Sequence, residues 1–201
     1  MLDYKILFIF ILPIWILVRV VLIRKKRSKG LFSIKMEVVL NLFCVYILCF
    51  IAITLFPLMI NRTGDRGMVS INIVPVFNTL SDVTNIPQEM HNFMIKFWIK
   101  NILGNMLLLF PLGILLPILW RKFENMRNTL LFSFVFSLGI EIIQLLSYYV
   151  GNNRRSFDID DIILNTFGAC LGHLFYKKIA IKLIIKQLLD NIKNIHFPKL
   201  T

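Results

Sequence analysis

The chain has 201 residues, of which 57% are Ala, Val, Ile, Leu, Met, Phe, Trp, Tyr or Cys and only 17% are charged. A soluble domain usually contains about 45–50% apolar and about 25% charged residues, so this composition excludes a soluble enzyme, a disordered tail and a secreted disulfide scaffold. The formal net charge is +12, from 23 Lys and Arg against 11 Asp and Glu. Most of the basic residues flank long apolar blocks, as topology signals do in membrane proteins. We therefore expect a multi-pass membrane protein that binds membrane lipids and no nucleic acid.

A helix needs about 20 apolar residues to cross the hydrocarbon layer of a membrane. Five segments approach that length: Ile6–Ile23, Val38–Ile60, Ile102–Trp120, Thr129–Val150 and Asp158–Tyr176. The first lacks a basic start and a small-residue cleavage site, which indicates a retained anchor rather than a signal peptide. The predicted fold is an all-α membrane bundle of about five transmembrane helices. We divide it into an anchor helix with a basic loop (residues 1–36), a transmembrane domain (37–177) and a basic amphipathic tail (178–201).

Lys and Arg are distributed unevenly over the loops that join these segments. One side has 15, in the first loop, the third loop and the tail: Arg24, Lys25, Lys26, Arg27, Lys29, Lys35, Arg121, Lys122, Arg127, Lys177, Lys178, Lys182, Lys186, Lys193 and Lys199. The other side has 7: Lys5, Arg62, Arg66, Lys96, Lys100, Arg154 and Arg155. Cytoplasmic loops carry an excess of Lys and Arg, so we expect the N-terminus outside and the C-terminus in the cytoplasm. Arg19, inside the first span, is expected to extend its charged head toward the inner side.

Two further stretches are expected to lie on the membrane surface. In the tail, apolar residues recur at helical spacing while the lysines lie off that stripe, which is typical of an interfacial amphipathic C-terminal helix. The apolar residues of this stripe are Ile181, Ile184, Leu188, Ile192 and Ile195. In the long outer loop, Phe93, Phe97 and Trp98 indicate a second interfacial segment. The preceding residues 73–77 are too short to span the membrane and are predicted to be extended or to dip into it.

Polar residues recur at helical spacing in the last three predicted spans. These stripes are Asn101 and Asn105 in the third, Ser137, Glu141, Gln144 and Tyr148 in the fourth, and Asp158, Asp161, Asn165, Gly168 and Gly172 in the fifth. With the charge-based orientation, all three stripes reach the outer half of the membrane, and Glu141 lies roughly 13 Å deep at a rise of 1.5 Å per residue. An ionised group there costs at least about 2.5–3.5 kcal/mol, so Glu141 should face the interior of the bundle and have a partner. We expect that partner to be Asn105, Asn165 or one of Arg154 and Arg155.

These side chains predict a polar pocket that opens outward and has arginines and aspartates at its mouth. The residues expected to bind a ligand there are Asn101, Asn105, Glu141, Gln144, Arg154, Arg155, Asp158, Asp161 and Asn165. Glu141 is the candidate catalytic residue if a reaction occurs. No cofactor or metal is expected; the residues that come nearest to a metal-ligand set are Asp158, Asp160 and Asp161.

Each part of the pocket also has a purely structural interpretation. Asp158 and Asp161 have the spacing of residues that cap the start of a helix. Asn101, Asn105, Asn165 and Gln144 can form interhelical hydrogen bonds, each worth about 0.6 kcal/mol. Gly168 and Gly172 form a small-residue motif that is typical of close helix packing and that also offers a contact for a homo-oligomer. Glu141 is the hardest to explain structurally, because a carboxylate in the middle of a span is costly.

At these residues the chain resembles the VanZ-like family of bacterial membrane proteins. The runs that carry the resemblance are Asn72-Ile73-Val74-Pro75-Val76-Phe77, Asn101-Ile102-Leu103-Gly104-Asn105, Phe110-Pro111-Leu112-Gly113, Glu141-Ile142-Ile143-Gln144, Arg155-Ser156-Phe157-Asp158-Ile159-Asp160-Asp161, and Asn165-Thr166-Phe167-Gly168 with Gly172. No short run is specific alone, but their order and spacing are, over roughly residues 37 to 177. The resemblance implies a protein of the bacterial cell envelope that contributes to low-level antibiotic resistance, against teicoplanin rather than vancomycin.

Three functions remain open on the sequence. The first is a binding protein whose outward pocket holds a lipid-linked peptidoglycan precursor or the lipoglycopeptide itself. The second is an intramembrane enzyme that acts on a lipid-linked envelope substrate through Glu141 and the cluster of Asp158, Asp160 and Asp161. Against an enzyme, the chain has no HExxH, GxSxG or Walker motif. The third is a small transporter or proton-coupled protein that uses Glu141.

Overall fold

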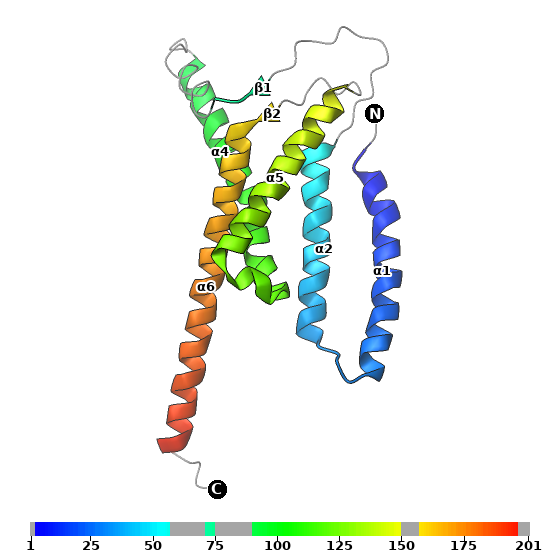
Figure 1. The fold of residues 1–201 in the computed structure, drawn as a ribbon, viewed down its shortest axis with the longest axis vertical. Coiled ribbons are helices and arrows are strands. Elements are labelled where there is room, and N and C mark those ends of the chain that lie inside the picture. Colours follow the sequence, from blue (N-terminus) through cyan, green and yellow to red (C-terminus); the bar gives the residue numbers. More distant parts are fainter. Residues whose placement is uncertain (1–2, 57–70, 75–89, 150–156, 197–201) are drawn as a thin grey trace.

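The computed structural model describes residues 3–56, 71–74, 90–149 and 157–196. Its elements are α1 (Lys5–Ser28), α2 (Ile34–Leu55), β1 (Ile71–Asn72), α4 (His91–Leu119), the 3-10 helix η2 (Arg121–Glu124), α5 (Met126–Tyr149), β2 (Phe157–Asp158) and α6 (Ile159–His196). The long helices alternate in direction, so the described loops α1–α2 and α4–α5 and the end of α6 lie away from the N-terminal end of α1 (Figure 1).

The predicted class, an all-α membrane bundle, is confirmed. Within the described residues, four helices are long and apolar enough to cross a membrane, namely α1, α2, α4 and α5. The fifth long helix, α6, is not among them, because Asp160, Asp161, Asn165 and His173 lower the hydropathy of its first half. It nevertheless packs along α4 and α5 as part of the same bundle (Figure 1).

Two helices are longer than the sequence analysis expects. α4 begins at His91, so Phe93, Phe97 and Trp98 belong to its first turns and are continuous with the predicted span. No proline or glycine lies between residues 91 and 102, so no signal ends the helix before the span begins. α6 likewise continues without a break from Ile159 to His196, so the predicted tail helix is the distal part of α6.

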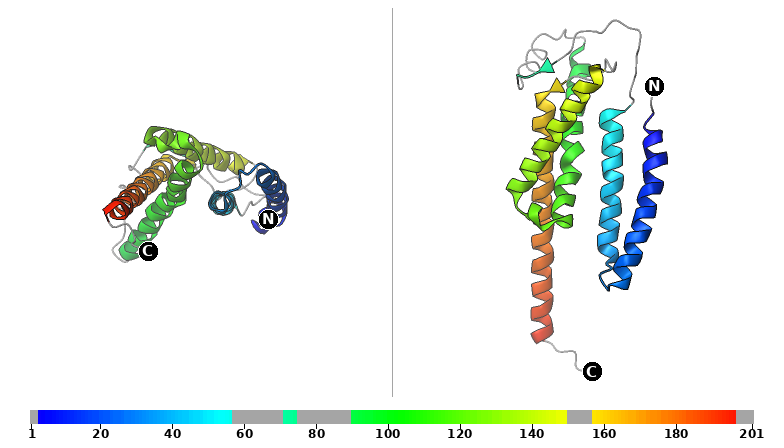
Figure 2. Two further views of the ribbon diagram at one scale, coloured as in Figure 1. Left: turned by 90° about the horizontal axis from the view of Figure 1, so that it is seen from below. Right: turned by 45° about the vertical axis from the view of Figure 1, so that its right-hand side comes forward.

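α1 and α2 form an antiparallel hairpin that lies beside the α4–α5–α6 group (Figure 2). Gly30 ends α1 with a φ of +66°, a left-handed conformation that favours glycine. The N–H of Leu31 donates to the carbonyl of Lys26 at 3.0 Å, and that of Gly30 to the carbonyl of Arg27 at 3.1 Å. These two bonds satisfy carbonyls that the helix end leaves unpaired, in the manner of a Schellman motif.

A buried ion pair joins the two helices of this hairpin. Arg19 and Glu37 are only 8% and 6% exposed and pair directly, and Nζ of Lys26 lies 3.0 Å from Oε1 of Glu37. Arg19 thus reaches toward the turn of the hairpin, and its head ends on Glu37, a partner that the sequence alone does not indicate. Trp15 Nε1 adds a hydrogen bond of 2.9 Å to Oδ1 of Asn41.

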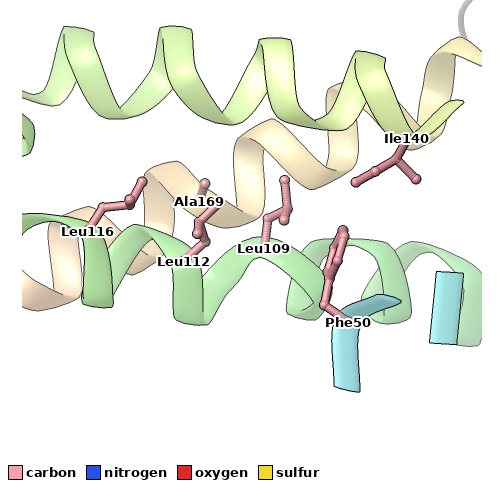
Figure 3. Close-up of a cluster of buried hydrophobic side chains, with 6 residues drawn as sticks. All are labelled: Phe50, Leu109, Leu112, Leu116, Ile140 and Ala169. Carbon is pink, nitrogen blue, oxygen red and sulfur yellow. The ribbon is translucent and has the colours of Figure 1, made fainter. Parts of the chain in front are cut away.

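The core of the bundle lies where α4 meets α6, α5 and α2. Its buried members are Phe50, Leu109, Leu112, Leu116, Ile140 and Ala169 (Figure 3). Glycines let α4 and α6 approach closely, because a side chain at Gly168 would overlap the carbonyl of Met106, and one at Gly172 that of Phe110. The small-residue motif therefore packs against α4 of the same chain. Since α4 covers that face, no oligomer is proposed through these two glycines.

At one end of the bundle, two short strands pair in parallel. Ile71 of β1 is opposite Phe157 of β2, and Asn72 is opposite Asp158. Asn72 is thereby tied to Asp158, the residue just before α6, which is 86 positions away in the sequence. Of the predicted stretch 73–77, residues 73 and 74 follow β1 without forming a helix, and the rest lies outside the described residues.

Candidate functional site

The polar stripes of three helices converge on one cavity of about 370 Å³. Its walls come from α2, α4, α5 and α6: Ile53, Thr54, Phe97, Lys100, Asn101, Gly104, Asn105, Leu108, Ile140, Glu141, Gln144, Asp161 and Asn165. Six of the nine predicted ligand-binding residues are among them: Asn101, Asn105, Glu141, Gln144, Asp161 and Asn165. Asp158 lies next to this cavity rather than in its wall, and Arg154 and Arg155 lie outside the described residues.

Glu141 is tied to Asp158, the residue that precedes α6. Its side chain is only 2% exposed, and its Oε2 accepts the backbone N–H of Asp158 at 3.0 Å. This partner differs from the asparagines and arginines that the sequence analysis names. The N-terminus of a helix carries unpaired N–H groups and the positive end of the helix dipole, so it stabilises a nearby carboxylate. That contact stabilises the Glu141 carboxylate at this position.

Asp158 caps α6. Its Oδ1 accepts the N–H of Asp160 at 2.9 Å and the side-chain N–H of Asn72 at 3.0 Å, so one carboxylate serves both the helix start and the strand pair. The capping interpretation is therefore correct for Asp158. Asp158 precedes α6 and lies outside the spanning helices, and burial raises the pKa of its carboxyl, against the two hydrogen bonds, which lower it.

Asp161 faces the cavity instead of completing the cap. In a capping box, the third helical residue would accept the N–H of the cap residue. Here Glu141 of α5 accepts that N–H, and Oδ1 of Asp161 accepts the side-chain N–H of Asn105 on α4. Because Asp161 is free of the cap, its carboxylate meets the side-chain amide of Asn105 in the cavity wall.

Two more hydrogen bonds join the helices that line the cavity. Nε2 of Gln144 donates to the carbonyl of Thr54 at 2.8 Å, which joins α5 to α2. Nδ2 of Asn165 donates to Oγ of Ser137 at 3.0 Å, which joins α6 to α5. Oδ1 of Asn165 is buried and has no hydrogen-bond partner within the described part of the chain. A buried acceptor without a partner costs free energy, which a donor in the cavity would recover.

The structure adds cavity residues that the sequence analysis missed. Lys100 and Phe97 line the cavity from α4, and Ile53 and Thr54 line it from α2. Helical periodicity was sufficient to find the first two, because positions 97, 100, 101, 104, 105 and 108 follow one stripe. In the sequence, Lys100 indicates only the topology. The residues of α2 carry no comparable signal, because residues 42–55 of that helix are almost entirely apolar.

Within the described residues, no group of three or more His, Cys, Asp or Glu side chains is placed to hold a metal ion. Asp158, Asp160 and Asp161 do not form such a group. Further along, His173 is fully buried, and its Nδ1 lies 3.3 Å from Oγ1 of Thr129. That hydroxyl donates to the carbonyl of Phe123, so Nδ1 carries the proton shared with Thr129.

The fold and the cavity define an all-α multi-pass membrane protein with a polar cavity inside its helix bundle. A sequence model of the VanZ/LLP1 family matches residues 43–184. The match extends over more than half of the chain, and the chain belongs to the VanZ/LLP1 family. Comparisons with curated proteins and with solved structures found no match. The family resemblance drawn from the sequence is thereby confirmed.

Proposed function

We propose that this protein is a binding protein of the bacterial cell membrane whose polar cavity holds the head of a lipid-linked cell-wall precursor or of a lipoglycopeptide. In this proposal the N-terminus and the cavity face outward and the C-terminus lies in the cytoplasm. Binding there contributes to low-level resistance against teicoplanin, as the family resemblance implies. The observation that carries the proposal is the convergence of polar side chains from three helices on a single cavity.

The chemistry of the cavity wall suits a head that carries both hydroxyl or amide groups and an anion. Asn101, Gln144 and Asn165 offer hydrogen bonds, and Lys100 offers a positive charge for a phosphate or a carboxylate. Glu141 and Asp161 already accept hydrogen bonds from the protein. Both carboxylates therefore shape the wall, and Lys100 is the group best placed to attract the ligand.

The rim of the cavity suits a ligand that arrives from the membrane. Ile53 and Phe97 line the cavity and are 66% and 55% exposed, on spanning helices whose outer surfaces contact lipid. A lipid-anchored head enters past such residues without its hydrocarbon part meeting water. A purely water-soluble ligand gains nothing from an apolar rim.

The test is drug susceptibility in a teicoplanin-sensitive Gram-positive host that expresses the full chain at matched membrane levels. Wild type should protect against teicoplanin and not against vancomycin. Gly104→Leu should abolish protection, because Gly104 lines the cavity and a Cβ there meets no atom within 4 Å, so the new side chain fills the cavity without disturbing the packing. Lys100→Gln should weaken protection, and Lys96→Gln, one turn earlier on α4 and outside the cavity wall, is the control.

Two results would contradict the proposal. Equal protection by wild type and Gly104→Leu would show that the cavity is not the binding site. No protection by wild type would separate this chain from the resistance that the family resemblance implies. Glu141→Ala is less decisive as a first variant, because Glu141 also holds the first turn of α6.

A further inference from the structure

A second hollow, of about 270 Å³, lies on α5 beside the polar cavity. Its lining is Phe132, Val135, Phe136, Gly139, Ile140 and Ile143, which follow one stripe of the helix. We call it the apolar groove. Val135 and Ile143 are 64% and 47% exposed, so the groove opens on the surface of a spanning helix, where lipid chains lie.

The groove and the polar cavity share a wall. Ile140 lines both, and it is buried between them at 7% exposure. The next residue, Glu141, points into the polar cavity, so the two hollows lie on adjacent faces of α5. A molecule that has a polar head and a hydrocarbon chain would therefore find a site for each part on either side of Ile140.

The glycines of the bundle fall into two groups that support this assignment. Gly113, Gly168 and Gly172 are needed for close packing, because a Cβ at each would overlap backbone atoms of the facing helix. Gly104 and Gly139 have no atom within 4 Å of an added Cβ. Glycine within a helix costs stability relative to alanine, and packing does not account for that cost at these two positions. One lines the polar cavity and the other lines the apolar groove, where the missing side chain leaves room.

We propose that the apolar groove holds the hydrocarbon chain of the lipid whose head occupies the polar cavity. The inference rests on the proposed function and adds the position of the chain. A lipid chain that enters the groove leaves other lipid rather than water, so the hydrophobic effect contributes little to its binding. The groove acts by shape: it selects a chain that fits and aligns the attached head with the cavity.

The experiment compares two probes that have the same head, a long-chain polyprenyl phosphate and geranyl phosphate. Each is radiolabelled and bound to the full chain in phosphatidylcholine nanodiscs at equal mole fraction in the membrane. Wild type should bind the long-chain probe more tightly by about tenfold, equivalent to ~1.4 kcal/mol. Gly139→Phe should remove that preference and leave geranyl phosphate binding unchanged. Ile142→Phe, on α5 outside both hollows, is the matched control and should keep the preference.

The outcomes separate this inference from the proposed function. If Gly139→Phe keeps the preference for the long chain, or if wild type shows none, the groove does not hold the chain and the inference is overturned, while cavity binding stands. If neither probe binds wild type, the proposed function fails, and the inference fails with it. Loss of both probes in Gly104→Leu, together with loss of only the preference in Gly139→Phe, supports both.

Discussion

The same substitution, glycine to alanine, should change stability in opposite directions at two places in this bundle. At Gly139 the new methyl group meets no atom within 4 Å. The helix then gains about 0.8–1.0 kcal/mol, the difference in helix propensity between alanine and glycine. At Gly168 the methyl group overlaps the backbone carbonyl of Met106, which cannot rotate away, so α4 and α6 must separate. Overpacking of this kind costs about 1–3 kcal/mol.

At Gly168, an overpacking cost of about 3 kcal/mol less a propensity gain of about 1 kcal/mol leaves a net loss of about 2 kcal/mol. For a chain of this size, 1 kcal/mol shifts the melting temperature by about 2–4 °C. Gly168→Ala should thus lower it by about 4–8 °C and Gly139→Ala should raise it by about 2–4 °C. The assay is thermal unfolding of the full chain in one detergent, followed by far-ultraviolet circular dichroism.

Gly172→Ala serves as a second member of the first group, because its methyl group would overlap the carbonyl of Phe110. The reasoning would be refuted if Gly168→Ala and Gly172→Ala melted at or above the wild-type temperature. It would also be refuted if Gly139→Ala lowered the melting temperature as much as Gly168→Ala and Gly172→Ala do. The glycines that face a neighbouring helix and the glycine that does not would then behave alike.

Three further predictions concern charge and hydrogen bonding. Glu37→Gln should lower the stability of the hairpin by about 3–5 kcal/mol, because it leaves Arg19 buried without its charged partner. Adding Arg19→Met to Glu37→Gln should restore part of that loss, as measured by thermal unfolding in a double-mutant cycle. Asp158→Ala should cost about 1 kcal/mol through loss of the α6 cap, whereas Asp158→Asn should cost less; equal losses in thermal unfolding would argue against capping. Gln144→Leu should cost about 0.6 kcal/mol by removing the α5–α2 hydrogen bond, and a loss well above about 1.7 kcal/mol would show that the side chain has a larger structural role.

The sequence predicts the membrane class and most of the cavity wall because both depend on local periodicity. Hydropathy places the spans, and a period of 3.6 residues puts Asn101 and Asn105, or Glu141 and Gln144, on one face of a helix. The cost of a buried carboxylate then requires that these faces turn inward. Hydropathy, helical period and the cost of burying charge do not depend on which helices are neighbours.

The contacts that depend on helix neighbours could not be predicted in this way. Nothing local indicates that Glu141 accepts the N–H of Asp158. In the sequence, Asp158 and Asp161 have the spacing of a capping box, in which Asp161 itself would accept that N–H. The role of Glu37 was missed for the same reason, since its partner Arg19 lies on another helix. The start of α4 at His91 was missed because aromatic residues at the head of a span resemble an interfacial segment.

Because α6 is long, a small change of its direction at the first turn corresponds to a large displacement at its last turn. At 1.5 Å per residue, its 38 residues form a rod roughly 57 Å long, against a hydrocarbon layer of about 30 Å. Its first turn is held by Glu141 of α5 and Asn105 of α4, and its glycines rest on α4. A tilt of about 5° at that turn would displace the last turn by roughly 5 Å, from the same length per residue. A small tilt of α6 at the cavity would therefore correspond to a larger displacement at the far end of the same helix.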